Sequence, residues 1–157
     1  MTEPPFVTGC DVVEVARLSA ALDRRAGLLA RVFTDREVDD ARRGGAAPGS
    51  PVERARLAAR FAAKEAARKA VGDLRLPFHA VEVRSASTGA PELWMHGARS
   101  TLACSLSHDA GVARAVVVGP APTSSPARPT ASPARPTSSP TPPTSSSTPP
   151  TTPSSDG

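Results

Sequence analysis

The chain has 157 residues, a net charge of +4 at pH 7 and a pI near 10.0, and it contains two cysteines. Two cysteines are too few for a disulfide framework, and no signal peptide or long apolar run is visible, which is typical of a reduced cytoplasmic protein without a membrane span. No aromatic-and-basic, zinc-binding or glycine-rich RNA-binding pattern accompanies the charge, so an anionic ligand or an acidic protein partner is favoured over nucleic acid.

Composition divides the chain near residue 120. From Pro120 to Gly157 the sequence is almost wholly Pro, Ser, Thr and Ala, and it holds twelve of the eighteen prolines. It contains no leucine, isoleucine, valine or aromatic residue, so it cannot offset the entropy lost on ordering. We therefore expect a folded domain over residues 1–119 and a disordered tail over residues 120–157.

The first expected element is a strand over residues 6–13, which is rich in β-branched residues and follows two prolines. Asp11 is anomalous within it. A carboxylate in an apolar run must be paired, exposed at a strand end or bound to a cation, because burying it alone is unfavourable. A short helix over residues 15–22 follows, with apolar residues on one face.

Two further helices are expected. Thr34 and Glu37 form a capping-box pattern that begins one helix, and this helix ends in a loop rich in glycine and proline at residues 44–51. The next helix covers residues 52–71, contains no proline and ends at Gly72, which suits a left-handed cap.

The central helix separates small and charged residues. Alanines occupy one half of the helical wheel, and the other half holds Arg60, Phe61, Lys64, Glu65, Arg68 and Lys69. The charged half is either a solvated surface, with an i,i+4 pair between Glu65 and Lys69, or a site in which Glu65 binds a metal and the cations hold phosphates. The helix alone leaves both interpretations open.

The pattern changes to alternation after Pro77. Residues 80–84 and 92–95 predict a hairpin with its turn at Gly89, and residues 102–107 and 112–119 predict a second strand pair. The run 115–118 is expected to be a buried central strand. One strand, then helices, then four strands indicate an α+β fold.

Three motifs in a fixed order now resemble the holo-acyl-carrier-protein synthase branch of the 4'-phosphopantetheinyl transferases. They are residues 9–18 (Gly-Cys-Asp-Val-Val-Glu-Val-Ala-Arg-Leu), 60–66 (Arg-Phe-Ala-Ala-Lys-Glu-Ala) and 105–108 (Ser-Leu-Ser-His). The resemblance covers nearly all of residues 7–119. It implies the fold of that family, an antiparallel sheet packed against a long central helix and shorter helices.

The resemblance also implies a reaction. Members of the family move the phosphopantetheine arm of coenzyme A to a serine of an apo acyl carrier protein, release adenosine 3',5'-bisphosphate and need Mg²⁺. It implies that Asp11 and Glu65 bind the Mg²⁺, which prefers oxygen ligands, and that Glu65 and Lys69 are catalytic. Either Glu65 or a metal-bound water could take the serine proton.

Other roles follow from the resemblance in the same way. The residues expected to bind coenzyme A are Arg60, Lys64, Lys69, Gly72, Ser107 and His108. Arg17 is expected to contact the carrier protein, since carriers are commonly acidic and the folded part of the chain is basic. The family is typically homotrimeric, with active sites between subunits. Whether the carrier serves fatty acid biosynthesis or a polyketide or peptide assembly line stays open.

The sequence departs from the family pattern after the central helix. The family usually has Gly-Thr-Gly there, whereas this chain has Gly72-Asp73-Leu74. Aspartate adds negative charge beside the expected phosphates, and Leu74 does not adopt glycine's backbone angles freely. The alternative hypothesis is therefore a catalytically impaired relative that serves as a carrier-protein binding module.

Overall fold

The computed structural model describes residues 5–121, so the tail expected from residue 120 onward lies outside the described residues except for its first two positions. The helices and strands, in chain order, are β1 (Phe6–Glu14), α1 (Val15–Arg24), α2 (Leu28–Val32), α3 (Asp35–Arg42), α4 (Pro51–Ala70), a 3₁₀ turn (Phe78–Ala80), β2 (Val81–Ser85), β3 (Pro91–Met95), β4 (Ala98–Arg99), β5 (Ala103–Asp109) and β6 (Val112–Pro120).

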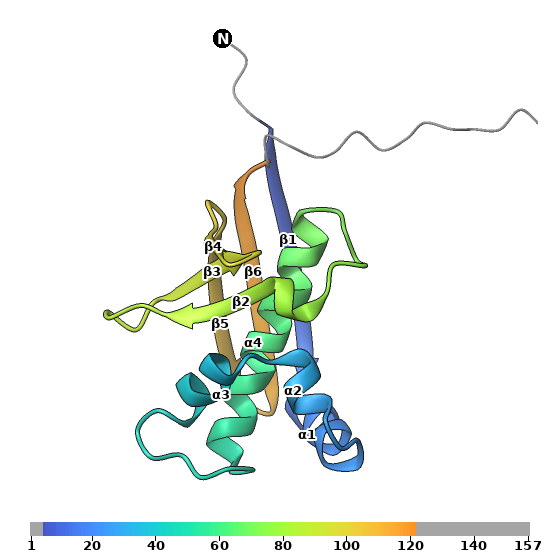
Figure 1. The fold of residues 1–157 in the computed structure, drawn as a ribbon, viewed down its shortest axis with the longest axis vertical. Coiled ribbons are helices and arrows are strands. Elements are labelled where there is room, and N and C mark those ends of the chain that lie inside the picture. Colours follow the sequence, from blue (N-terminus) through green and yellow to red (C-terminus); the bar gives the residue numbers. More distant parts are fainter. Residues whose placement is uncertain (1–4, 122–157) are drawn as a thin grey trace, which may run out of the picture. The chain divides into compact units, whose positions relative to one another are not determined.

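The strands form two antiparallel sheets of three strands each, in the orders β1-β6-β5 and β2-β3-β4. The α4 helix lies across the first sheet, and α1, α2 and α3 gather around its N-terminal half (Figure 1). The expected α+β fold is confirmed, with α2 and β4 as additional short elements. No helix within residues 5–121 has the length and apolarity needed to cross a bilayer.

The α4 helix packs very closely on β1 because both surfaces are nearly flat at the contact. Its alanines at 62, 63, 66 and 67 are fully buried. A Cβ atom added to Gly9 would collide with the carbonyl oxygen of Ala66 and would lie 2.7 Å from the backbone nitrogen of Ala70. Glycine at position 9 therefore sets the distance between β1 and the C-terminal half of α4.

Hydrogen bonds at the ends of the helices follow the sequence closely. The capping box of α3 is present, with the Thr34 hydroxyl accepting from the Glu37 amide and the Glu37 carboxylate accepting from the Thr34 amide. Gly72 has a φ of 72°, and the amides of Gly72 and Asp73 donate to the carbonyls of Lys69 and Arg68. This Schellman arrangement ends α4 where the sequence predicts.

The outer face of the first sheet is open, which corrects the expectation of a buried central strand. β6 is central, but only alternate residues are buried: Ala115 and Val117 face α4, whereas Val116 and Val118 are exposed. Phe6 and Val12 of β1 are exposed as well. The strand is therefore buried on one face, and its other face presents an apolar surface made by Phe6, Val12, Val116 and Val118, here called the open sheet face.

Lys64 is completely buried and does not belong to an exposed charged face. Its ammonium lies 2.7 Å from the Glu37 carboxylate and donates to the carbonyls of Val81, at 2.6 Å, and Phe78, at 3.0 Å. Burial lowers the pKa of Lys64, although the neighbouring Glu37 carboxylate opposes the shift. This lysine thus joins α4 to α3 and to the edge of β2.

The buried pair of Lys64 and Glu37 makes a stability prediction. Lys64→Met leaves the Glu37 carboxylate buried without its cation, so we expect the free energy of unfolding to fall by about 3–5 kcal/mol. Urea denaturation followed by the fluorescence of Trp94, the only tryptophan, measures this change. The double variant Lys64→Met/Glu37→Gln removes both charges of the pair and should recover part of the loss. A double variant less stable than the single one would contradict the account.

Candidate functional site

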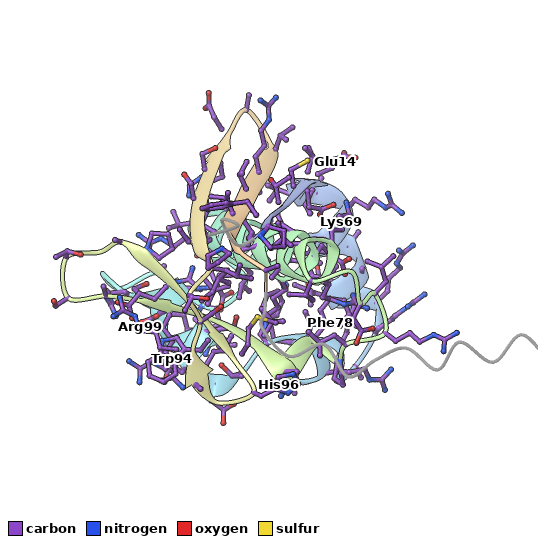
Figure 2. All side chains as sticks on the ribbon, turned by 90° about the horizontal axis from the view of Figure 1, so that it is seen from above. Glu14, Lys69, Phe78, Trp94, His96 and Arg99 are labelled. Atoms are coloured by element: carbon purple, nitrogen blue, oxygen red, sulfur yellow. The ribbon has the colours of Figure 1, made fainter. Side chains whose placement is uncertain are left out.

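A cavity of about 460 Å³ opens where β1, α1 and the C-terminal half of α4 meet. Its charged lining residues are Asp11, Glu14, Arg17, Arg25, Glu65 and Lys69. Apolar side chains from α1, α2 and α4, among them Leu18, Val32 and Phe61, form the rest of the wall. Seen along α4, Glu14 and Lys69 lie on the side of β1 and α1, away from Trp94 and Arg99 of the second sheet (Figure 2).

Asp11 and Lys69 form a direct ion pair in this cavity. Asp11 lies opposite Ala115 in the β1-β6 register, and so on the face of the sheet that α4 covers. The Lys69 Nζ atom lies 2.7 Å from Asp11 Oδ1 and 3.1 Å from the carbonyl oxygen of Cys10. The hydrogen bond to Asp11 raises the pKa of Lys69 above its usual range. The carboxylate that is anomalous in the sequence therefore has a cation partner.

Glu65 reaches the same cavity from α4 and pairs with Arg68. The distance from Arg68 Nη1 to Glu65 Oε1 is 2.6 Å. The i,i+4 pair between Glu65 and Lys69, considered as one interpretation of the sequence, does not form, because Lys69 turns to Asp11 instead. Within residues 5–121, Glu65 Oε2 and Asp11 Oδ2 have no hydrogen-bond partner, so each carboxylate keeps one free oxygen.

These two carboxylates fit a magnesium ion in part. Carboxylate oxygens are the ligands that Mg²⁺ prefers, and the ion is usually held by one or two carboxylates while water and substrate phosphates complete its shell. No cluster of three or more His, Cys, Asp or Glu side chains that could enclose a metal is present within residues 5–121. The site is thus suited to an ion that arrives with a phosphate ligand rather than to one enclosed by protein.

The other residues expected to bind coenzyme A do not line this cavity. Arg60 is buried on the other side of α4, where its guanidinium donates to the Ser85 hydroxyl at 3.2 Å and lies 3.9 Å from Asp40. Ser107 and His108 are exposed on β5, which pairs with β6 at the edge of the first sheet. Lys64 is enclosed by Glu37 and two carbonyls, which differs from the expected position beside phosphates. Among the expected coenzyme ligands, Lys69 alone lines the cavity.

Arg17 lines the cavity from α1, as expected for a residue next to the site. The sequence predicts no role at the site for Glu14, Arg25 or Phe61, and it predicts Arg68 only as one of the cations on the charged half of α4. Of these, Arg68 has a signal in the sequence, since residues three apart on a helix are neighbours. The others depend on how α1 and α2 fold back over α4, which no local pattern shows.

The loop Gly72-Asp73-Leu74, which replaces the family's Gly-Thr-Gly, forms an unstrained turn. The Asp73 carboxylate accepts from the Arg75 amide at 2.9 Å, which stabilises the turn. In the described part of the chain only His96 and Ala110 are non-glycine residues with positive φ, so Leu74 carries no left-handed strain. Gly72 takes the left-handed conformation, but it does not line the cavity.

Comparison with known proteins gives a consistent result. A model of the 4'-phosphopantetheinyl transferase superfamily matches residues 8–119. The holo-[acyl-carrier-protein] synthase of Frankia alni is 42% identical over 120 residues, which cover 70% of this chain and 92% of the relative. The protein of the same name from Beutenbergia cavernae is also 42% identical over 120 residues and is covered to 93%.

Solved structures agree with the sequence comparison. A Bacillus anthracis holo-(acyl-carrier-protein) synthase in complex with CoA (3',5'-ADP) aligns with a TM-score of 0.60 and 31% identity, covering 74% of this chain and 96% of that one. The Helicobacter pylori holo-[acyl-carrier-protein] synthase in complex with coenzyme A aligns with a TM-score of 0.58 and 27% identity, covering 70% and 96%.

The ion pair between Asp11 and Lys69 makes a prediction about titration. Asp11→Asn removes the charge that favours the protonated amine, so the pKa of Lys69 should fall. The chain contains two lysines, Lys64 and Lys69, so ¹³C-lysine labelling gives two side-chain signals to follow against pH by NMR. Glu92→Gln, which removes the partly exposed partner of Arg99, is the control and should leave the titration of Lys69 unchanged. A Lys69 titration that is the same in wild type and Asp11→Asn would contradict the pairing.

Proposed function

The chain belongs to the 4'-phosphopantetheinyl transferase superfamily, and from this membership we propose the metal, the product and the residues of its reaction. It is an enzyme of the holo-[acyl-carrier-protein] synthase type, which transfers phosphopantetheine from coenzyme A to an apo acyl carrier protein. The acceptor is a serine of the carrier, the reaction depends on Mg²⁺, and the product released is adenosine 3',5'-bisphosphate.

One observation carries the proposal: Asp11 of β1 lines the same cavity as Glu65 and Lys69 of α4, although it is more than fifty positions away in sequence. The negative charge that develops on the oxygens of a pyrophosphate ester must be stabilised by cations. The Lys69 ammonium is one such cation, and two carboxylates can hold a divalent ion as another. We assign Asp11 and Glu65 to the Mg²⁺. When bound, this ion supplies positive charge to the phosphate oxygens.

The residues of the chain then have separate roles in the transfer. The serine oxygen of the carrier forms a bond to the phosphorus of the phosphopantetheine phosphate, and the bond from that phosphorus to the bridging oxygen breaks. The Lys69 ammonium stabilises the charge that collects on the departing bisphosphate. We propose Glu65 as the candidate base for the serine proton within the chain, since its carboxylate lines the same cavity as Asp11 and Lys69.

Several residues expected to bind coenzyme A lie outside the cavity. They could still contact the coenzyme if copies of the chain assemble. We propose a homotrimer, in which Gly72, Ser107 and His108 contribute to coenzyme bound at or near a neighbouring copy, whereas the buried Arg60 stays with Ser85 and Asp40. The open sheet face supports this, since Phe6, Val12, Val116 and Val118 are exposed together on the first sheet. Ser107 lies beside Arg114 in the β5-β6 register, two positions along from Val116, so the same face would bring it to an interface.

Lys64 receives a structural role in place of the coenzyme contact, because its ammonium already has three partners inside the protein. We propose Arg17 as a contact for an acidic carrier, since it lies on α1 at the edge of the cavity. We also place the reaction in the cytoplasm, where the two free cysteines would stay reduced.

The direct test is transfer of the arm itself. Purified protein, coenzyme A, Mg²⁺ and an apo acyl carrier protein are mixed, and mass spectrometry measures the carrier. We expect the carrier to gain the mass of the phosphopantetheine arm. Glu65→Gln and Asp11→Asn should each lower kcat by about 10²–10³-fold or more, because each removes charge stabilisation at the transition state.

Glu92→Gln is the matched control for these two variants, since it neutralises a partly exposed carboxylate on the second sheet. It should keep wild-type activity. If Glu65→Gln or Asp11→Asn is fully active, the metal assignment is wrong. If several carriers gain no mass while coenzyme A still binds, the chain is a binding module rather than an enzyme.

The assembly makes a separate prediction. Val116→Glu places a charge in the centre of the open sheet face and should convert the expected trimer into single chains, measured by light scattering. Val52→Glu is the control, because Val52 on α4 is 49% exposed and Val116 is 48% exposed. It should leave the assembly intact. A wild-type particle of one chain would contradict the proposed trimer.

A further inference from the structure

Arg68 stands in the last turn of α4, three residues beyond Glu65, and its side chain is only 12% exposed. Its Nη1 atom bonds to Glu65 Oε1 at 2.6 Å, and its Nη2 atom donates to the carbonyl oxygen of Leu74. The two ends of one guanidinium therefore reach a carboxylate of the cavity and the backbone of the loop after α4.

The aromatic ring of Phe78 makes a third contact with the Arg68 guanidinium. Its central carbon lies 4.6 Å from the centroid of the Phe78 ring, a distance typical of a cation–π contact. Phe78 is itself stacked on Phe61, with ring centroids 5.4 Å apart, and Phe61 lines the cavity. Arg68 thus lies on a platform that is continuous with the cavity wall.

These three contacts distinguish Arg68 from an ordinary surface ion pair. An exposed i,i+3 pair contributes little, because both side chains are free to move and solvent screens the charges. Here the carbonyl of Leu74 and the Phe78 ring fix the position of the guanidinium independently of its bond to Glu65. The planar fork of arginine permits both hydrogen bonds at once, which the single ammonium of lysine does not reproduce.

We infer that Arg68 is a positioning residue for Glu65: it holds Oε1 and so orients the carboxylate with Oε2 available to the proposed ion. This inference rests on the proposed function, since it concerns how Glu65 meets the metal. Groups that orient a metal ligand typically change metal affinity or activity by about 10–100-fold when they are removed. The loop that departs from Gly-Thr-Gly has a part in this arrangement, because the Leu74 carbonyl holds Arg68.

The test measures metal binding apart from turnover. Mn²⁺ is titrated into the full chain with saturating coenzyme A, and the free ion is followed by electron paramagnetic resonance. Arg68→Met should raise the apparent Kd for Mn²⁺ by about 10–100-fold. Arg68→Lys should recover part of this affinity, since it restores the charge without the fork.

Arg75→Met is the matched control, because it removes the same charge from an exposed position of the loop after α4 that makes no contact with Glu65. It should bind Mn²⁺ as wild type does. An equal loss in Arg75→Met would show that overall charge, not positioning, sets the affinity, and would overturn the inference. An Arg68→Met affinity within about twofold of wild type would overturn it as well.

Phe78→Leu keeps Arg68 and its charge but removes the ring beneath it, so it serves if Arg68→Met fails to fold. It should weaken Mn²⁺ binding in the same direction by a smaller factor, and wild-type affinity would count against the inference. The carrier assay separates the two proposals. If the wild type transfers the arm but Arg68→Met binds Mn²⁺ as tightly as the wild type does, only the positioning role of Arg68 is wrong. If Mn²⁺ binding weakens in Arg68→Met but the wild type transfers no arm to any carrier, only the proposed reaction is wrong.

Discussion

The contact between β1 and α4 at Gly9 is the constraint on which the rest of the structure depends. A side chain at this position would collide with the backbone of α4 at Ala66 and Ala70. Small residues on both surfaces therefore let the helix lie directly against the strand. Two residues along β1, this closeness brings Asp11 within 2.7 Å of Lys69. Without it, the two elements could not share a cavity.

Neighbouring residues of α4 serve opposite sides of the molecule because they point about 100° apart on the helix. Lys64 points into the protein, where it joins Glu37 and the edge of β2. Glu65 lines the cavity. The contacts of Lys64 fix the rotation of α4 about its axis. That rotation in turn directs the Glu65 side chain into the cavity. A single turn of helix thus connects the stability of the second sheet with the geometry of the proposed metal site.

The sequence predicts the elements well where the signal is local. The capping box at Thr34, the Schellman end at Gly72 and the two hairpins all form as expected, since each depends on residues within a few positions. The sequence does not predict the one-sided burial of β6, because Ala115–Val118 is a continuous apolar run of which only alternate residues are buried. Local patterns also identified Asp11 and Glu65 as notable, and the resemblance supplied their proposed roles.

The partners of the charged residues were beyond local patterns. Glu37 and Lys64 are 27 positions apart, and only the packing of α3 on α4 brings them together. Lys69 was open to pairing with Glu65 on its own helix, yet it bonds to Asp11, which the approach at Gly9 makes available. Whether a charged side chain pairs with a residue on its own helix or with one distant in sequence depends on the tertiary structure. A helical wheel alone cannot predict it.

The central claim is that Asp11 and Glu65 bind one divalent ion that holds the coenzyme. A crystal structure with coenzyme A and Mn²⁺, analysed by anomalous scattering, tests it most directly. The account predicts one anomalous peak within bonding distance of an oxygen from each carboxylate and of a phosphate oxygen of the coenzyme. A peak bound by only one of the two carboxylates, or a coenzyme bound away from both, would contradict it.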